Sequence, residues 1–555
     1  MLLSLLACNG TEPEPPTPGE VTWHGDIAPL VQENCVVCHN EDGMQPDIVF
    51  SPETAQALAP SMLHEVTSGA MPPFYAEQTE VCDNPWGFAP DPRLSEEDKD
   101  LLAAWVDGGA PLGDPDEAAP LPEPPDGKLA AADVEAFPAG QYTTGLIGAV
   151  EDEFVCFSIE IGADQDRWLE AYQVLPEDLG VVHHVLIGID EAGATAAMVD
   201  EDGLYDCFGG FGVAATFIGG WIPGASPVEF PEHSAYRVPA GSRIVLQMHY
   251  HLLDEARQDG TGVALRWAED TPVQEAIMGL IGNSNSQNAD GTGLQPGEAD
   301  GGDPRFFIPA GASDHVETMK YQPWEGAPLP LETFLVANHM HYIGRDMRMW
   351  VERPGGEDCL VHTPDWDFDW QQFYFYDADS DAAPTVEPGD TLMLECRYDN
   401  SLENPAVKKA LDEAGLDEPI DVTLGEGSLD EMCIGVLGQV YDVPTSVVGE
   451  THSGTVEVRV SSADFGFSEV SCTGPASVAD DGSLEGVAAC GLDLGGTLYT
   501  VMFSLDSSDV EVGVLYLEET IRAPWTGSVE EGITLDVSGD FAGGSVQFEG
   551  SIVLD

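Results

Sequence analysis

The feature that most constrains the fold is a sequence pattern between residues 141 and 445, in which short strand-like runs alternate with turns. Segments such as "RIVLQMHYHLL", "TFLVANHMHYIG" and "TLMLECRYD" are separated by Gly, Pro and Asp clusters. This pattern is typical of β-sandwiches and barrels. The chain has 555 residues, which is too long for one ordinary domain, so we expect several domains in series.

Composition changes along the chain mark the expected boundaries. A Pro/Glu/Thr-rich stretch follows the start, helical patterns come next, and a stretch rich in Pro, Asp, Glu and Ala precedes the strand-like runs. Such a stretch reads as a linker. The expected segments are 1–20 (signal and tether), 21–113 (helical domain), 114–140 (linker), 141–445 (β-rich) and 446–555 (a further β-rich domain of unknown role).

The charge balance excludes one class of partner. The chain carries 100 Asp and Glu residues against 18 Lys and Arg residues, for a net charge of −82. Such a surface repels nucleic acid and anionic lipid, so we expect no nucleic-acid binding. The charge favours an adaptation for solubility or high salt; steering of a cationic partner is the alternative.

The first ten residues, "MLLSLLACNG", are apolar up to Cys8, and a flexible stretch follows. This start resembles a bacterial lipoprotein signal, in which the cysteine becomes acylated, although no Lys or Arg precedes the apolar run. We therefore expect export to the periplasm, outer membrane or cell surface, with contact to a membrane only through a lipid anchor on Cys8. The sequence has no apolar run of 18 residues that would span a bilayer.

A haem-attachment motif lies near the start of the helical domain. "CVVCH" lets Cys35 and Cys38 form thioethers to haem vinyl groups while His39 ligates the iron. A zinc site would need a second ligand pair nearby, and the next cysteine, Cys82, is isolated. Residues 21–113 therefore resemble a class I c-type cytochrome, and the resemblance implies a small all-α domain that binds haem c.

The second axial ligand should come from a later loop. "SGAMPPF" offers Met71, whose following prolines would stiffen the backbone; Met44, Met62 and His64 are the rivals. The last helix of the domain should begin after Ser95, a good N-cap, and end at Gly108-Gly109.

Five histidines lie in three strand-like contexts of the β-rich region. They are the adjacent His183 and His184, His249 in "LQMHYH", and His339 and His341 in "NHMHYIG". The i, i+2 spacing of the last pair places both on one face of a strand. Adjacent residues on a regular strand point to opposite faces. If His183 and His184 share one metal, we expect a strand end or bulge there.

The order of these motifs, followed by "DEMC", resembles the copper type II, ascorbate-dependent monooxygenases, a family that includes the peptidylglycine α-hydroxylating and dopamine β-hydroxylating enzymes. The resemblance covers roughly residues 141–445. It implies two β-sandwich domains, at 141–305 and 306–445, with one copper each and a solvent-filled cleft between them. The implied ligands are His183, His184 and His249 for the first copper, and His339, His341 and Met432 for the second.

The resemblance also implies roles for the remaining groups. Neutral imidazoles suit copper, and a thioether favours the cuprous ion that meets O2. The second copper would thus be the catalytic one, and the first would store an electron. The implied disulfides are Cys156–Cys207 and Cys396–Cys433, and Cys472–Cys490 is expected in the tail; the pairing of Cys82 and Cys359 is left open.

Two positions depart from the peptide-amidating members of that family. Those enzymes place an Arg two residues before the H-x-H motif and a Tyr four residues after the methionine; here the positions hold Ala337 and Val436. A C-terminal glycine peptide is therefore not the expected substrate, and a neutral or cationic molecule fits better. His251 is expected to be a bystander or an outer group, and His233, His315 and His362 are expected to be surface or core residues.

Together these features predict an exported copper monooxygenase that hydroxylates a C–H bond of a small organic substrate with O2. Electrons would come through the fused haem from a periplasmic donor, either a reduced cytochrome or an ascorbate-like reductant. The alternative is a non-catalytic copper and haem electron-transfer lipoprotein. A zinc hydrolase fits less well, because the motifs lack a Glu base and Met is a poor zinc ligand.

Overall fold

The computed structural model describes residues 21–554, and in residues 453–554 it describes the backbone only. Short stretches within this range lie outside the description: residues 41–47, 123–127, 147–151, 214, 289, 298–303, 324–329, 378–382, 426, 428, 443–452, 463–466, 479–483, 494–497, 506–508, 515–516, 525, 529–531 and 542–543. The chain forms two compact units: Met1–Phe74 with Asp91–Gly127, and Tyr75–Pro90 with Lys128–Asp555.

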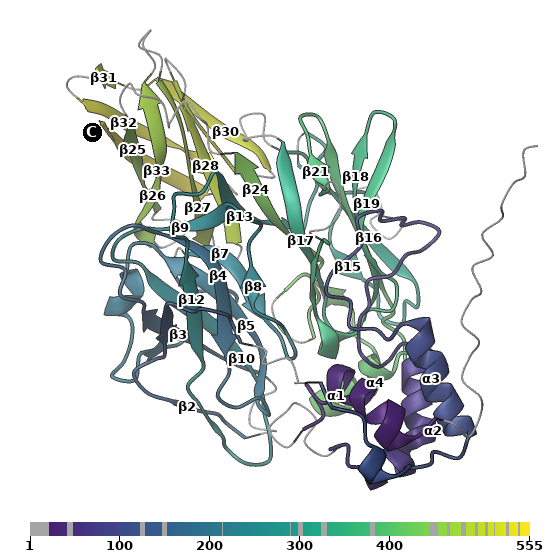
Figure 1. Ribbon diagram of the computed structural model, residues 1–555. Helices are drawn as coiled ribbons and strands as arrows, with labels where there is room; N and C mark the ends of the chain where they lie inside the picture. Colours follow the sequence, from purple (N-terminus) through teal and green to yellow (C-terminus); the bar gives the residue numbers. More distant parts are fainter. Residues whose placement is uncertain are drawn as a thin grey trace, which may run out of the picture. The chain divides into compact units, whose positions relative to one another are not determined.

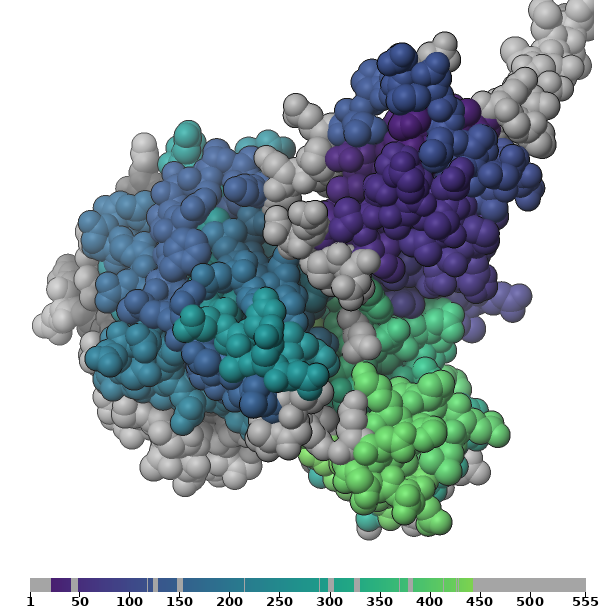
Figure 2. Space-filling model, turned by 90° about the horizontal axis from the view of Figure 1, so that it is seen from below, coloured from purple at the N-terminus to yellow at the C-terminus, as the bar shows by residue number. Residues whose placement is uncertain are grey.

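The N-terminal unit is built from helices and turns (Figure 1), and Figure 2 draws its atoms in purple and dark blue. Ser95 caps α3 (Glu96–Asp107) by accepting a hydrogen bond from the Asp98 amide, and Gly108 ends the helix, as expected. Trp105 is fully buried, and its ring centroid lies 5.8 Å from that of Trp23. The elements are η1 (Trp23–Ile27), α1 (Ala28–Asn34), α2 (Pro52–Ser68), α3 (Glu96–Asp107) and η2 (Pro115–Glu117).

The first β-sandwich packs a five-stranded sheet against one half of a larger sheet. The five-stranded sheet has the order β6 (Leu204–Tyr205), β3 (Asp152–Glu160), β10 (Arg243–His251), β5 (Val182–Asp190) and β7 (Thr216–Trp221). Its buried side chains, such as Leu246 and Ile187, share one hydrophobic core with Tyr172 and Leu265 of the facing sheet.

The larger sheet runs through both halves of the β-rich region. Among the described residues its order is β1 (Val134–Ala136), β12 (Gly262–Trp267), β4 (Arg167–Leu175), β9 (Ser234–Val238), β13 (Gln274–Gly282), β24 (Ile434–Asp442), β17 (Leu331–His339) and β20 (Phe373–Phe375). β8 (Val228–Glu229) pairs with β4, and β21 (Thr385–Val386) pairs with β17. β13 and β24 are antiparallel neighbours along their whole lengths, so the two sandwiches share one sheet.

The second sandwich packs β17 and β24 against another five-stranded sheet, with the order β14 (Gly293–Leu294), β16 (His315–Tyr321), β22 (Thr391–Tyr398), β18 (Gly344–Arg353) and β19 (Gly356–Thr363). Gly435 of β24 permits the close approach of the layers, because a Cβ there would lie 2.9 Å from the sulfur of Met349. Shorter elements are β2 (Tyr142–Thr143), β11 (Gln258–Asp259), β15 (Phe307–Ile308), β23 (Val422–Thr423), η3 (Ala194–Ala197), η4 (Phe368–Trp370) and α4 (Pro405–Ala414).

The backbone of residues 453–554 forms a separate antiparallel sheet (Figure 1). Its order is β30 (Leu517–Pro524), β29 (Asp509–Val514), β28 (Leu498–Leu505), β27 (Leu484–Asp493), β26 (Phe467–Val478), β25 (Ser453–Ser462), β33 (Gly544–Leu554), β32 (Gly532–Phe541) and β31 (Thr526–Ser528).

The expected mainly β architecture is thus confirmed, with few helices in the described residues. The assignment of residues 21–113 as a cytochrome and the domain boundaries stay predictions, although Tyr75–Pro90 groups with the β-rich unit. Among the described residues, no helix has the length and the apolar character that crossing a membrane requires.

Candidate metal centre

The first three histidines come from neighbouring strands of the first sandwich. His183 and His184 lie near the start of β5, and His249 lies near the end of the antiparallel β10. His249 pairs with His184, whereas the next residue, Tyr250, pairs with Val182. His183 is therefore the extra residue of a β-bulge, which confirms the irregularity expected from the adjacent histidines.

The three rings converge through the same atom type. The Nδ1 atoms of His183 and His249 are 3.2 Å apart, those of His183 and His184 are 3.2 Å apart, and those of His184 and His249 are 3.3 Å apart. The centre of such a triangle lies roughly 1.9 Å from each nitrogen, close to the usual metal–imidazole bond length of about 2.0 Å. A hydrogen bond needs one protonated and one unprotonated nitrogen, so the three mutual Nδ1 contacts cannot all be hydrogen bonds at the same time. The geometry fits a cation bound at the centre.

The surroundings favour the neutral form of the His184 ring and hold the His249 ring in place. The pKa of His184 is well below its usual value, mainly because the ring is buried and also because His249, His183, His339 and His341 surround it. A neutral imidazole is the form that binds metal. Phe154 of β3 stacks on His249 with the planes 6° apart and the centroids 4.3 Å apart.

The second group lies where β17 ends and β24 begins. The strand ends at His339, so His341 lies beyond it rather than on the same regular strand, and the two ring centroids are 5.2 Å apart. The Nδ1 atom of His339 is 2.6 Å from the Gln371 Oε1 atom, and that of His341 is 3.1 Å from the Asp430 carbonyl oxygen. Because both partners accept, each Nδ1 must donate, which leaves each Nε2 with a lone pair for a metal.

Glu431 fastens the backbone of this group. Its carboxylate is fully buried and accepts amide hydrogen bonds from His341 at 2.6 Å, Met432 at 2.8 Å and Ile343 at 3.2 Å. Burial raises the pKa of Glu431 to about 8, and these backbone amides oppose the shift. The acid therefore holds the segments that carry His341 and Met432 together.

One short segment touches both groups. The ring of Phe368, in η4, stacks on His183 with centroids 5.4 Å apart, and its centroid lies 6.2 Å from that of His341. Gln371, three residues later, is the partner of His339. An aromatic side chain thus occupies part of the interval where the family resemblance implied only solvent. Neither Phe368 nor Gln371 belongs to a recognisable motif, so sequence reasoning missed both; Glu431 was visible inside "DEMC" but was assigned no role.

The two positions that depart from the amidating enzymes are cross-strand neighbours. Ala337 of β17 pairs with Val436 of β24, and both are buried in the apolar core of the first sandwich. Neither side chain can bind a carboxylate.

Three disulfides hold the described part of the β-rich unit. Cys156–Cys207 and Cys396–Cys433 are the pairs that the resemblance implied. The second lies next to Met432, whose carbonyl also accepts from the Tyr398 hydroxyl at 2.8 Å. The structure joins the two cysteines left open, Cys82 and Cys359. The side chains of Cys472 and Cys490, and all of Cys8, lie outside the description.

The predicted haem residues lie in turns of the N-terminal unit. Cys35 and Cys38 are free thiols in the turn after α1; burial, and then the neighbouring Cys38, raise the pKa of Cys35 to about 11. The His39 ring lies 5.2 Å from Phe50, and burial lowers its pKa, although the Ile48 backbone opposes this. Met71 lies in the turn after α2. Of its rivals, His64 is exposed, Met62 packs against the core and Met44 lies outside the description.

The other histidines take separate positions. His251 and His233 are exposed. His315 lies 2.8 Å from the buried carboxylate of Glu317. His362 is buried between Thr79 and Asp346, with distances of 2.8 Å and 3.1 Å from its two ring nitrogens.

Comparisons with known proteins found distant relatives. The chain is 25% identical over 229 residues to DBH-like monooxygenase protein 1 of Mus musculus, 24% to that of Homo sapiens and 23% to that of Gallus gallus. Each match covers 39% of this chain and 35% of the relative, so the chain spans about a third of the curated relatives it matches. No protein-family model matches the chain. This distant similarity supports the resemblance to the copper type II monooxygenases.

Proposed function

We propose that the protein is a copper-dependent monooxygenase with one copper at each histidine group. The observation that carries the proposal is the convergence of three Nδ1 atoms, 3.2 to 3.3 Å apart, beside a second histidine pair. Copper at these sites would supply electron storage and O2 activation. The protein would incorporate one oxygen atom into a C–H bond of a small organic substrate.

In this proposal the two histidine groups have different roles. His183, His184 and His249 form the site that stores an electron. His339, His341 and Met432 form the catalytic site, because its thioether ligand suits the cuprous ion. Glu431 positions two of these ligands and is not available as the general base of a hydrolase, since both its oxygens already accept backbone amides.

The surroundings of the catalytic site favour a substrate without a carboxylate. Ala337 and Val436 provide no positive charge or hydroxyl where a carboxylate clamp would lie. A small hollow nearby is lined mainly by apolar side chains, including Ile343 and Val407. A neutral or cationic organic molecule is therefore the proposed substrate class.

The N-terminal unit would bind haem c and supply electrons in place of a diffusing reductant. The donor set fits: Cys35 and Cys38 are not joined to each other, and His39 has the lowered pKa of a neutral ligand. The three disulfides of the described chain agree with export to an oxidising compartment. The donor to the haem would be a periplasmic cytochrome or a small reductant.

Metal analysis and EPR spectroscopy of the exported protein test this function. We expect two coppers and one low-spin haem per chain, and copper-dependent O2 consumption with members of a neutral and cationic substrate library. Zinc, or one copper only, would overturn the proposal. Two coppers without substrate-dependent O2 consumption would favour the non-catalytic electron-transfer protein.

A further inference from the structure

A segment from the middle of the helical part of the sequence is built into the second β-sandwich. Residues Tyr75–Pro90 belong to the β-rich unit, although the residues before and after them belong to the N-terminal unit. The chain therefore enters this segment from the N-terminal unit and returns to it. Met71, the expected axial ligand, precedes the segment by four residues.

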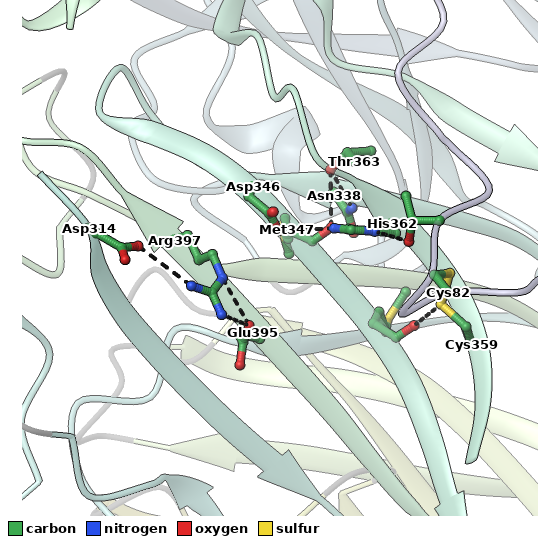
Figure 3. A network of polar contacts seen from close by, with 12 residues as sticks. Cys82, Asp314, Asn338, Asp346, Met347, Cys359, His362, Thr363, Glu395 and Arg397 are labelled. Carbon is green, nitrogen blue, oxygen red and sulfur yellow. Dashed lines mark hydrogen bonds and ion pairs between the residues drawn. A yellow bond between two sulfur atoms is a disulfide. The ribbon is translucent and has the colours of Figure 1, made fainter. Parts of the chain in front are cut away.

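Covalent and polar contacts fix the segment to β19. The disulfide Cys82–Cys359 joins it to β19 (Figure 3). The amide of Glu77 donates to the His362 carbonyl at 2.9 Å, and the side chain of Asn84, which is buried, donates to the Leu360 carbonyl at 3.1 Å.

Aromatic contacts secure the far end of the segment. The ring of Phe88 stacks on Tyr376 with centroids 5.2 Å apart, and the amide of Ala89 donates to the Phe375 carbonyl at 3.0 Å. Contacts along the length of the segment thus attach it to the β-rich unit. A simple linker between domains would not need so many contacts.

From this segment, a chain of buried polar contacts leads to a predicted copper ligand. The Thr79 hydroxyl lies 2.8 Å from the His362 Nδ1 atom. The next residue, Thr363, is fully buried, and its hydroxyl accepts from the Asn338 side chain at 3.0 Å. Asn338 directly precedes His339. Figure 3 shows His362, Thr363 and Asn338 side by side. Two side-chain hydrogen bonds and two peptide links therefore join Thr79 to His339.

We propose that Tyr75–Pro90 is the electron-entry segment of the β-rich unit, and that it leads to the His339 site through His362, Thr363 and Asn338. This inference rests on the proposed function. One electron would pass at a time: the haem iron would go from Fe(II) to Fe(III), and a copper ion at His339, His341 and Met432 from Cu(II) to Cu(I). The route reaches the catalytic group directly, without passing the three-histidine site.

The covalent part of the proposal can be tested without any cofactor. A protease site is inserted between Gly127 and Lys128 and is then cleaved. We expect the two fragments to migrate together on a denaturing gel without reductant, because Cys82–Cys359 joins them, and to separate when a reductant is added. Cys82→Ala should separate them in both lanes. Fragments of the parent chain that separate without a reductant would overturn the attachment.

The route is tested with Thr363→Val, which keeps the side-chain shape and removes the hydroxyl that accepts from Asn338. After rapid mixing with a donor, haem reoxidation by copper is followed optically. We expect a several-fold slower transfer, with two coppers still bound and with unchanged direct reduction of copper by ascorbate. Thr391→Val, a buried threonine of the same sandwich that bonds Gln322 instead, should transfer at the parent rate.

The outcomes separate the two proposals. Haem transfer at the parent rate in Thr363→Val would overturn the route and leave the copper monooxygenase standing. A protein without covalently bound haem would overturn the haem part of the proposed function, and the route with it.

Discussion

The bulge at His183 decides whether three imidazoles can meet. On a regular strand, His183 and His184 would point to opposite sheet faces. The register shift opposite Tyr250 turns His183 toward the ring of His249 on the neighbouring strand. At the residue scale, therefore, one extra backbone position brings the rings of two adjacent histidines to the same point, as a shared metal ion would require.

Replacing one of these three histidines should remove one bound copper ion. We expect His249→Ala to reduce bound copper from two ions to one per chain, because two imidazoles hold the ion far less firmly than three. Copper is measured by elemental analysis after dialysis. His251→Ala is the matched control, since His251 lies two residues further along and is exposed. Two coppers in His249→Ala would contradict the assignment.

A half-buried acid outside the two histidine groups should make stability depend on pH. Burial raises the pKa of Glu191 to about 8, although Thr216 donates a hydrogen bond to it at 2.7 Å and opposes the shift. The folded state holds this proton more tightly than the unfolded state, so the stabilisation is present below about pH 4.5 and is lost as the pH rises toward 8.

Glu191→Gln should remove this loss. From pH 6 to pH 9 we expect the free energy of unfolding to fall by at least about 1 kcal/mol less in the variant than in the parent. Urea unfolding at each pH gives the values. If the free energy of unfolding changed with pH equally in the parent and the variant, the ionisation of Glu191 would not destabilise the folded state, and the prediction would be wrong.

At the element scale, Glu431 fastens the end of β17 to the start of β24. Three amides that point into a buried region would lose their acceptor in Glu431→Ala. Each unsatisfied buried amide costs about 1 to 3 kcal/mol, so we expect a loss of roughly 3 kcal/mol or more in urea unfolding.

The same change should weaken copper at the His339 group and spare the His183 group. Glu431→Gln, which keeps one acceptor oxygen, should lie between the parent and the alanine variant in both measurements. The exposed Glu418 offers a neutral comparison through Glu418→Ala. Copper affinity at the His339 group that stays at the parent value in Glu431→Ala would refute the positioning role.

The sequence predicted the strands that carry the histidines better than it predicted the residues that hold those histidines in place. The ligand strands, the bulge and the disulfide beside Met432 follow from spacing and from a family resemblance. No local sequence pattern encodes contacts between segments that lie far apart in the chain. The positions of Phe368 and Gln371 and the disulfide Cys82–Cys359 depend on such contacts. The i, i+2 spacing of His339 and His341 predicted that both lie on one strand. In the structure β17 ends at His339, so His341 lies beyond the strand.

At the scale of the whole molecule, the net charge of −82 should make stability sensitive to salt. Self-repulsion of like charges destabilises a compact chain, and the screening length falls from about 10 Å to about 3 Å between 0.1 and 1 M salt. We therefore expect the Tm to rise by about 5 °C or more over this range. A flat or falling Tm in calorimetry would mean that specific ion pairs outweigh the net repulsion.

Along the described chain, the helices α1 to α3 come first and most of the strands follow. The sharing of one sheet by both sandwiches was not foreseen, because strand pairing between Gln274–Gly282 and Ile434–Asp442 joins segments about 150 residues apart. Periodicity identifies strands, but it does not say which edges meet.

That shared sheet limits how the protein can be divided. A shortened chain that ended before β24 would leave β13 with nine unpaired residues along one edge, and such edges recruit strands from other molecules. The two sandwiches are joined by one continuous sheet, and each of them carries one of the two histidine groups. Gene fusions, truncations and domain exchanges should therefore treat residues 128–442 as indivisible.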